Sequence, residues 1–352
     1  MPLQVRALDM GVPVRFRRAA TAFFNHRSRD PRQGPEMGDG FPVMRLVWSI
    51  NYLHMEGVMG WRYEGLFETE ITPEADDLSR YWRPQPSEIP VGRMGYRRSV
   101  VLAGDRLECE IYPVFGRDEA QKARAARKNI TPEKQKKLNN KRALRHLIQL
   151  ADANFTDRDI HLTLTYRHET TLPACRMNIR NFLLRVKRYR AKHRMEPLKY
   201  IYTIEGRTDL SKGFPVNRIH VHMLMNGGIS RELLEEMWEM GYANADRLQP
   251  TERGLEEIAT YIIKEARDRK QGSRKWSASR NLKQPQKRTT DAKTSNRAVK
   301  LIAHDFQHTA KAEMEKLYPR YSFVDCKVYY SDQLDGVYIR VLMRRKKTGG
   351  KT

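Results

Sequence analysis

Two histidines that stand two residues apart, His220 and His222, are the first pair in this sequence that could do chemistry. They belong to an alternating run, 218–225, whose pattern predicts a β-strand. Side chains alternate between the two faces of a strand, so both imidazoles lie on one face. The other face then carries Ile219, Val221, Met223 and Met225. Two imidazoles on one face can share a metal ion, and the alternative is a hydrogen-bonded histidine pair at a sheet edge.

A carboxylate in the preceding predicted strand could complete a metal site. The strand 199–205 places Ile201, Thr203 and Glu205 on one face, and a loop connects it to the histidine strand. Antiparallel pairing of the two strands would bring Glu205 beside the two histidines. Two imidazoles and one carboxylate leave positions open for water or phosphate, which suits a divalent cation such as Mg²⁺ or Mn²⁺. The alternative for Glu205 is a surface carboxylate at the end of a strand.

A tyrosine and a lysine on a later predicted helix could supply a nucleophile. The run 254–265 has a buried stripe at helical spacing, made of Leu255, Ile258, Ala259 and Ile262. Tyr261 and Lys264 stand three residues apart on one flank of this stripe. A tyrosine with its ordinary pKa of about 10 is a poor nucleophile at neutral pH, but near a divalent cation its phenolate can attack a phosphodiester. Lys264 could lower that pKa or stabilise charge on the phosphate. The alternative for Tyr261 is an amphipathic residue at a core edge.

The elements that must position these residues can be predicted from turns, caps and periodicity. A hairpin should turn at Gly104-Asp105, and a helix should begin after Thr131, with the stripe Leu144, Leu147, Ile148 and Ala151 inward. The basic faces of that helix favour either contact with a DNA backbone or plain solvation. Strand 160–166 alternates apolar and polar residues. The next predicted element is a helix with Ile179, Phe182, Leu183 and Val186 inward. After it we expect a helix capped by Ser230 and a strand over 242–248. A helix over 298–317 and a hairpin at Asp335-Gly336 complete the chain.

The composition indicates a polyanionic partner. The 352 residues contain 66 Lys+Arg against 42 Asp+Glu, a formal net charge of +24. An excess of this size favours nucleic acid over a neutral metabolite, with an anionic membrane surface as the other candidate. No apolar run approaches the roughly 20 residues that cross a bilayer, and we expect neither a lipid anchor nor a secretion signal. Three distant cysteines without a CxxC pair predict no disulfide framework, and the expected location is the cytoplasm.

The basic segment 267–297 contains candidates for holding single-stranded DNA. They are Arg274, Lys275 and Arg280 for phosphate contact and Trp276 for base stacking. The alternative is a solvated, partly disordered linker. The terminal Gly350-Lys351-Thr352 lacks the upstream glycine of a Walker A motif, so an ATP-driven helicase is not expected within this chain.

Three of these stretches, in this order, resemble the motifs of HUH endonucleases: the strand 160–166, the histidine strand 218–225 and the helix with Tyr261 and Lys264. The tyrosine follows the histidines, which resembles rolling-circle replication initiators of phages, plasmids and integrated elements rather than relaxases. The resemblance covers about 100–345 and is strongest over 135–285. It implies that His220 and His222 bind the metal, that Tyr261 is the nucleophile and that Lys264 is the lysine of its helix. Glu205 occupies the variable position of a third, acidic ligand.

The sequence patterns and the resemblance together predict the fold and the division of the chain. We expect an α+β fold whose central antiparallel sheet carries the His-x-His metal site, with helices packed on one face, the tyrosine helix nearby, and a C-terminal helix and hairpin. The predicted domains are an unassigned N-terminal region (1–95), an HUH-type nuclease domain with a basic lead-in helix (96–268), a basic linker (269–297) and the C-terminal helix and β-hairpin (298–347). The N-terminal region is either an accessory domain or arm, or a further DNA-contacting surface.

The activity implied is that of a nickase. Such an enzyme cuts one strand of single-stranded or hairpin DNA at an origin, remains linked to the 5′-phosphate through its tyrosine, and leaves a 3′-OH for a host polymerase, with unwinding by a host helicase. A single tyrosine on the helix argues against strand exchange by a tyrosine pair within one chain. The alternatives are a single-tyrosine transposase or mobilisation relaxase with the same site, and a non-catalytic DNA-binding protein; a ribonuclease or RNA-binding protein is a more distant one.

Overall fold

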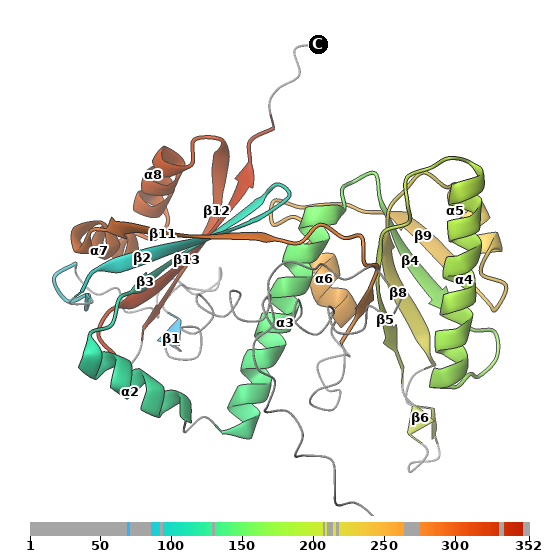
Figure 1. Cartoon of the computed structure of the whole chain (residues 1–352), viewed down its shortest axis with the longest axis horizontal. Coiled ribbons are helices and arrows are strands. Elements are labelled where there is room, and N and C mark those ends of the chain that lie inside the picture. The colour runs from blue at the N-terminus through green and yellow to red at the C-terminus, as the bar shows by residue number, and fades with distance from the viewer. Residues whose placement is uncertain are drawn as a thin grey trace, which may run out of the picture. The chain divides into compact units, whose positions relative to one another are not determined.

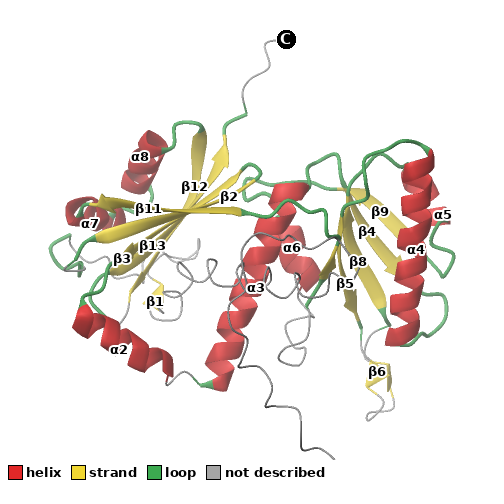
Figure 2. Ribbon diagram, in the orientation of Figure 1, coloured by secondary structure: helices red, strands yellow, loops and turns green. Residues whose placement is uncertain are grey.

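A computed structural model describes residues 69–70, 86–91, 94–128, 131–206, 208–209, 214–215, 218–263, 275–330 and 334–347. All of them belong to Tyr52–Thr352, the second of two compact units into which the chain divides (Figure 1). Most of the unassigned region 1–95 lies outside the described residues, and so do Lys264 and Arg274. The fold class is α+β with antiparallel sheets, which confirms the prediction (Figure 2).

The predicted histidine strand lies in the middle of a five-stranded sheet. Every pairing between neighbours in this sheet is antiparallel. The strand order is β10 (Ser277–Ala278), β5 (Tyr200–Glu205), β8 (His220–Met225), β4 (Ile160–Thr165) and β9 (Ala243–Arg247). The predicted pairing of 199–205 with 218–225 is therefore confirmed, and the histidine strand has a neighbour on each side.

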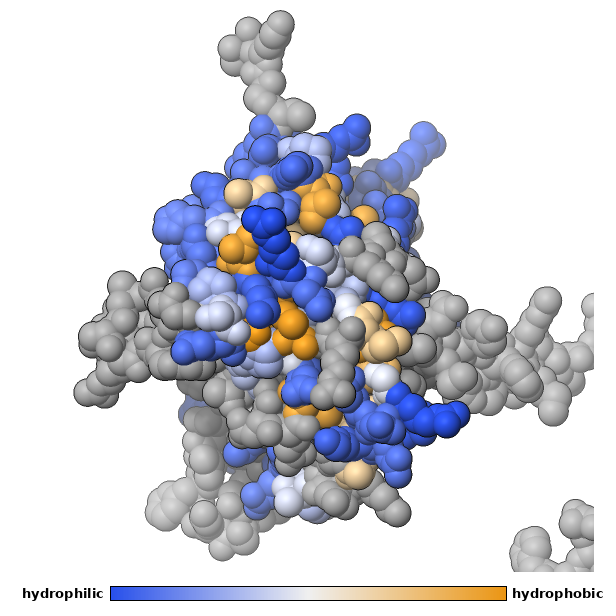
Figure 3. Space-filling model, turned by 90° about the vertical axis from the view of Figure 1, so that its left-hand side faces the viewer, coloured by the Kyte–Doolittle hydropathy of each residue, from blue (hydrophilic) through white to orange (hydrophobic). Residues whose placement is uncertain are grey.

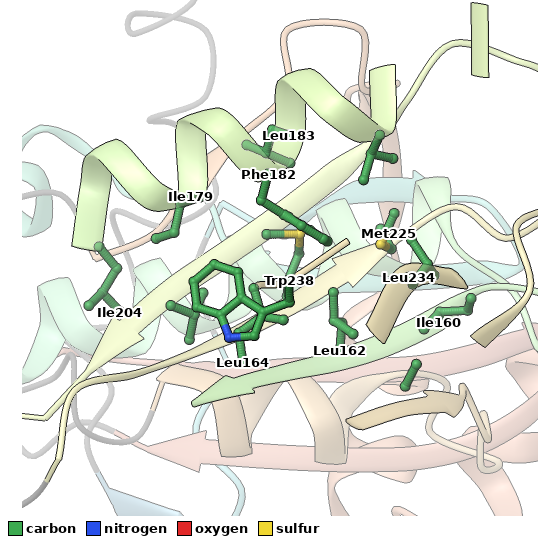
Figure 4. Close-up of a cluster of buried hydrophobic side chains, with 14 of the residues drawn as sticks. Ile160, Leu162, Leu164, Ile179, Phe182, Leu183, Ile204, Met225, Leu234 and Trp238 are labelled. Carbon is green, nitrogen blue, oxygen red and sulfur yellow. The ribbon is translucent and has the colours of Figure 1, made fainter. Parts of the chain in front are cut away.

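One face of this sheet is covered by α4 (Leu172–Lys192) and α5 (Arg231–Glu236). In Figure 4, Ile179, Phe182 and Leu183 project from α4 into a cluster that contains Trp238 and Leu162. Both helices begin at caps, because the hydroxyl groups of Thr171 and Ser230 accept hydrogen bonds from backbone N–H groups of the first turns; the sequence predicted the cap at Ser230 but not the one at Thr171. The apolar side chains of the alternating strands point to this face. The polar side chains of these strands therefore lie on the opposite face.

The opposite face, which carries the histidines, is partly covered by α3 (Pro132–Asn154) and α6 (Glu256–Ile263). The predicted stripe of α3 packs there with the stripe of α6 against two sheet residues, Ile201 and Leu224. Helices thus lie on both faces, whereas the sequence predicted packing on one face with the tyrosine helix nearby. Figure 1 shows α3 and α6 on one side of this sheet and α4 and α5 on the other.

A second, six-stranded sheet is built from both ends of the described chain. The strand order is β1 (Thr69–Glu70), β12 (Tyr321–Tyr330), β13 (Val337–Arg345), β3 (Arg106–Pro113), β2 (Tyr96–Ala103) and β11 (Gln286–Thr294). The predicted hairpins at Gly104 and Gly336 are confirmed as β2–β3 and β12–β13. The remaining elements are α2 (Arg117–Lys128), α7 (Asn296–His304), α8 (His308–Leu317) and the small ribbon of β6 (Thr208–Asp209) and β7 (Phe214–Pro215).

Two predicted segments differ from the structure. The basic stretch 269–297, expected as a linker, contains β10 and the nine-residue β11, which pairs with β2. Charged side chains are common on an edge strand because they oppose pairing with other chains, so a basic composition hid this strand. The expected single helix 298–317 is two helices, because the carboxylate of Asp305 accepts hydrogen bonds from the backbone of His308 and Thr309 and starts a new helix. The predicted domain boundaries remain a proposal.

Buried charges connect the six-stranded sheet to α3. Arg106 and Glu108 on β3 form, with Arg145 and Asp152 on α3, what we call the arginine–carboxylate network. The Oε1 atom of Glu108 accepts from Arg106 at 2.6 Å, and its Oε2 atom accepts from Arg145 at 2.6 Å. The four side chains are at most 4% exposed. Breaking a buried pair of this kind leaves an uncompensated charge, so the network holds this sheet and α3 together.

The visible surface is mostly polar (Figure 3). The part of the face in Figure 3 that is not grey is predominantly hydrophilic, with small separate apolar patches. Among the described helices, none combines the length and apolarity that a bilayer crossing requires. The three cysteines, Cys109, Cys175 and Cys326, are buried and free.

Candidate active site

The register of the sheet brings the predicted metal ligands together. Glu205 on β5 lies directly opposite His220 on β8, and Thr203 lies opposite His222. Directly opposite residues of an antiparallel pair share a face. Glu205, His220 and His222, which we call the histidine cluster, therefore lie on the face that α3 and α6 partly cover. Their ligand atoms all lie within 4.8 Å of one another.

Both imidazoles present the same ring nitrogen to the carboxylate. The Nε2 atoms of His220 and His222 lie 3.5 and 3.7 Å from Glu205 Oε2. His220 Nδ1 lies 2.9 Å from the backbone oxygen of Arg218, which can only accept, so this nitrogen carries the proton and Nε2 carries the lone pair. His222 Nδ1 lies 3.2 Å from the hydroxyl of Thr163. Contacts of this kind orient metal-binding histidines.

The cluster fits a divalent cation because two buried atoms of the site have no hydrogen-bond partner among the described residues. These atoms are Glu205 Oε1 and His222 Nε2, and both side chains are at most 6% exposed. Burial, and then the neighbouring imidazoles of His161 and His220, lowers the pKa of His222 to about 4. At pH 7 this histidine is therefore neutral, which is the state that binds a metal. Buried polar atoms are normally paired, so two buried atoms without such partners in one cluster indicate a ligand.

Tyr261 lies over this cluster. Its ring centroid is 5.0 Å from that of His222, at an interplanar angle of 72°. The tyrosine is 54% exposed, so substrate can reach it from solvent. The hydroxyl of Thr203 donates to the backbone oxygen of Ile262 at 2.7 Å and so ties β5 to the turn that carries the tyrosine. Lys264 lies outside the described residues, which cover α6 over Glu256–Ile263, so its predicted role stays a prediction.

The first turn of α6 is fixed by the arginine–carboxylate network. The carboxylate of Asp152 accepts from the backbone N–H of Leu255 at 3.0 Å, and Arg106 forms an ion pair with Glu256 at 3.1 Å. Gly254 precedes the helix with a φ of +73°, and a Cβ atom there would lie 2.4 Å from Asp152. The position of the tyrosine helix over the histidines thus depends on charges that come from the other sheet.

One residue of the site was not predicted. His161 on β4 stacks on the imidazole of His222, with ring centroids 5.4 Å apart and an interplanar angle of 20°. Its ring also meets that of Tyr261 edge-on at 6.4 Å. Burial lowers the pKa of His161, against the raising effect of Asp246. The alternation of strand 160–166 placed His161 on the polar face, but the sequence did not show that β4 pairs with the histidine strand.

The predicted DNA-binding residues have different surroundings. Lys275 donates to the side chain of Asn140 on α3. Trp276 is partly buried, packs against the cluster between α3 and α6, and lies 6.1 Å from the ring of His146. Arg280 is exposed beside the short edge strand β10. This segment thus closes one edge of the histidine sheet, and its predicted contact with DNA stays a prediction.

Comparison with known proteins concerns the same stretch. Residues 159–268 match the family model described as Replication-associated protein ORF2/G2P. This segment resembles replication-initiator proteins. The match begins next to β4 and covers all described residues of α6, so it includes the histidine cluster, His161 and Tyr261. It confirms the resemblance drawn from the three motifs, over a shorter range than the 100–345 expected. No curated protein and no solved structure matches the chain.

Proposed function

We propose that this protein initiates rolling-circle replication by nicking one DNA strand through a covalent 5′-phosphotyrosine intermediate. The observation that carries the proposal is the position of Tyr261, whose ring centroid lies 5.0 Å from that of His222. The ring lies over a cluster in which Glu205 Oε1 and His222 Nε2 have no hydrogen-bond partner among the described residues. The match of 159–268 to replication-associated proteins and the net charge of +24 support DNA as the substrate.

His220, His222 and Glu205 would hold a divalent metal ion, Mg²⁺ or Mn²⁺, through two nitrogens and one oxygen. Bound there, the ion would polarise the scissile phosphodiester and offset its developing negative charge. Thr163 and the backbone of Arg218 hold the two imidazoles so that their Nε2 atoms face the carboxylate. This orientation exists before any substrate binds, which lowers the reorganisation needed during the reaction.

Tyr261 would then attack the phosphorus. Its oxygen forms a bond to phosphorus while the bond to the 3′ oxygen breaks, leaving the 5′-phosphate on the tyrosine and a free 3′-OH. The proposed role of Lys264 is to stabilise charge near this phosphate. Reversal of the same step joins the ends and terminates a round. A host polymerase would extend the 3′-OH and a host helicase would unwind the duplex.

The experiment is a covalent-transfer assay. The full chain is incubated with Mn²⁺ and 5′- or 3′-end-labelled single-stranded DNA from the surroundings of its own gene, and the products are separated on a denaturing gel. We expect the 3′-end label, which remains on the fragment with the new 5′ end, to move to the mass of the protein, and we expect no such band with EDTA or with Tyr261→Phe. DNA binding without any covalent band would contradict the proposal and favour a non-catalytic DNA-binding protein.

A further inference from the structure

A second exposed tyrosine lies in the same row of the sheet as the histidine cluster. Glu205 lies opposite His220, and His220 lies opposite Thr165 on β4. The row continues to Tyr242, because the backbone N–H and the hydroxyl of Thr165 both donate to the backbone oxygen of Tyr242, at 2.8 and 3.0 Å. Neighbouring strands lie about 4.8 Å apart, so Tyr242 is about 10 Å from His220.

The alternation of β9 places the side chain of Tyr242 on the histidine face. Ala245 is buried on the side of α4, where Ala243 also packs, whereas Asn244 and Asp246 are exposed. Since Asn244 lies opposite Thr163, whose hydroxyl contacts His222, the even-numbered residues share the face of the cluster. Tyr242 directly precedes the strand, and the hydrogen bonds from Thr165 to its backbone oxygen continue the register, so it extends this even-numbered series.

Tyr242 is rigidly presented to solvent. At 76% exposure it is the most exposed of the large hydrophobic side chains in the described part of the chain. Its backbone is nevertheless fixed by the two hydrogen bonds from Thr165. A Cβ atom at the preceding Gly241 would lie 2.4 Å from the backbone oxygen of Thr165 and 2.6 Å from the backbone nitrogen of Arg167, so the chain approaches β4 as closely as only glycine allows. A fixed backbone beneath an exposed aromatic ring lowers the entropy cost of binding.

Two arginines at the same end of the sheet as the Tyr242 ring suit the phosphate backbone of a nucleic acid. Arg167 lies two residues after the end of β4 and Arg218 two residues before the start of β8, so both stand at the end of the sheet that carries the row. Both are exposed. Aromatic rings that stack on bases beside basic groups that contact phosphates are the general means of holding a single strand without reading its sequence.

We propose that Tyr242 is a stacking platform for an unpaired base of single-stranded DNA, beside the phosphate that the histidine cluster receives. The proposal deepens the proposed function, since it rests on single-stranded DNA as the substrate of that site. The strand would cross the row from Tyr242 toward His220, with Arg167 and Arg218 near its phosphates. Tyr242 is a binding residue in this account and takes no part in the bond-breaking step.

The test measures binding without cleavage. The full chain carrying Tyr261→Phe is titrated, in EDTA, into a short fluorescein-labelled oligothymidylate. We expect Tyr242→Ala to weaken binding about tenfold or more, and Tyr242→Phe to bind within about twofold of the parent, because stacking requires only the ring. The slope of log affinity against log salt should stay the same, because no phosphate contact is removed. The matched control is Met177→Ala, since Met177 is 59% exposed on α4, which covers the other face.

Three results would contradict the proposed stacking role of Tyr242. The first is unchanged affinity in Tyr242→Ala, and the second is an equal loss of affinity in Tyr242→Phe and Tyr242→Ala. The third is a loss of the same size for duplex DNA, because a paired base cannot stack on the ring. Photocrosslinking of an oligonucleotide that contains 5-iododeoxyuridine gives a direct second readout, with the crosslink expected in the tryptic peptide 232–247. Since no measurement here depends on nicking, a failed covalent-transfer assay and a failed platform are separate results.

Discussion

Glu108 and Glu205 are two buried glutamates with opposite surroundings. Glu108, in the arginine–carboxylate network, is 1% exposed, and each of its oxygens accepts from a guanidinium group. Burial alone would raise the pKa of Glu108, but the guanidinium groups of Arg145, Arg106 and Arg340 outweigh it and hold that pKa well below its usual range. Glu205, in the histidine cluster, is 6% exposed, faces two imidazoles, and has one oxygen without a hydrogen-bond partner among the described residues.

The difference separates two uses of a buried carboxylate. In the network the countercharges come from the chain itself, so the carboxylate serves the fold and holds α3 and the tyrosine helix in place. In the histidine cluster the described residues leave one carboxylate oxygen and one imidazole nitrogen without hydrogen-bond partners, which is the basis for the proposed cation site. The two clusters therefore predict different responses to substitution, metal and pH.

The largest effect is expected from Glu108→Leu. This change leaves Arg106 and Arg145 buried without their shared carboxylate, which should lower the free energy of unfolding by about 3–5 kcal/mol. The matched variant is Glu205→Leu, which removes a buried carboxylate with no guanidinium partner in the described structure and should change stability by less than about 1 kcal/mol. Urea unfolding followed by circular dichroism measures both. Equal losses in the two variants would remove the distinction between the clusters.

The next largest effect is the stabilisation of the folded protein by a bound metal ion. Mn²⁺ at about 100 times its dissociation constant should raise the free energy of unfolding of the parent by about 2.7 kcal/mol, since the ion binds the folded state. The double variant His220→Ala, His222→Ala should show no such gain, and metal titration calorimetry should detect no site. The control is His308→Ala, whose side chain is 90% exposed outside the cluster. A metal-induced gain that survives the double substitution would place the cation elsewhere.

The pH dependence of stability should follow Glu108. A carboxylate with a depressed pKa in the folded protein contributes stability above its unfolded pKa of about 4.3, and this contribution is lost as the pH falls toward the folded value. The stability difference between the parent and Glu108→Gln should therefore be full at pH 7 and should shrink below about pH 4.3. Burial raises the pKa of Asp152, which acts in the opposite sense but is present in both proteins. Chemical unfolding at pH 7 and pH 3.5 checks this, and a difference that grows toward acid would refute it.

The smallest effect should come from Thr163→Val. This change removes the hydroxyl that lies 3.2 Å from His222 Nδ1 and so releases the orientation of one ring of the proposed metal site. Metal affinity should fall about tenfold, with stability nearly unchanged, because groups that orient a ligand typically contribute this much. Thr163→Ser keeps the hydroxyl and should bind metal like the parent in the same calorimetric titration. An unchanged affinity in Thr163→Val would mean that the hydroxyl does not position His222.

The sequence predicted the parts of this site that depend on local periodicity. Alternation within two strands placed Glu205 and the two histidines on one face, and helical spacing placed Tyr261 at the edge of a buried stripe. His161 was not found because strand alternation does not say which strands become neighbours. The network was not found for a related reason, since Arg106 on β3 and Asp152 on α3 are 46 residues apart and meet only through tertiary packing.

The basic segment shows a second limit of sequence patterns. The stretch 269–297 was expected as a linker on composition, yet β11 completes the six-stranded sheet. An edge strand keeps one row of hydrogen-bonding groups and many side chains in solvent, so it can carry the charges that also characterise linkers. Composition alone does not distinguish an edge strand from a linker, and only the pairing of β11 with β2 in the structure shows the strand.

The most direct test of the central claim is to find which residue becomes linked to DNA. The protein is incubated with single-stranded origin DNA and Mn²⁺, the adduct is digested with trypsin and nuclease, and the modified peptide is sequenced by mass spectrometry. We predict a 5′-phosphonucleotide on peptide 254–264, whose only tyrosine is Tyr261. Linkage to Tyr242 or to any other residue would contradict the assignment of Tyr261 as the nucleophile above the histidine cluster.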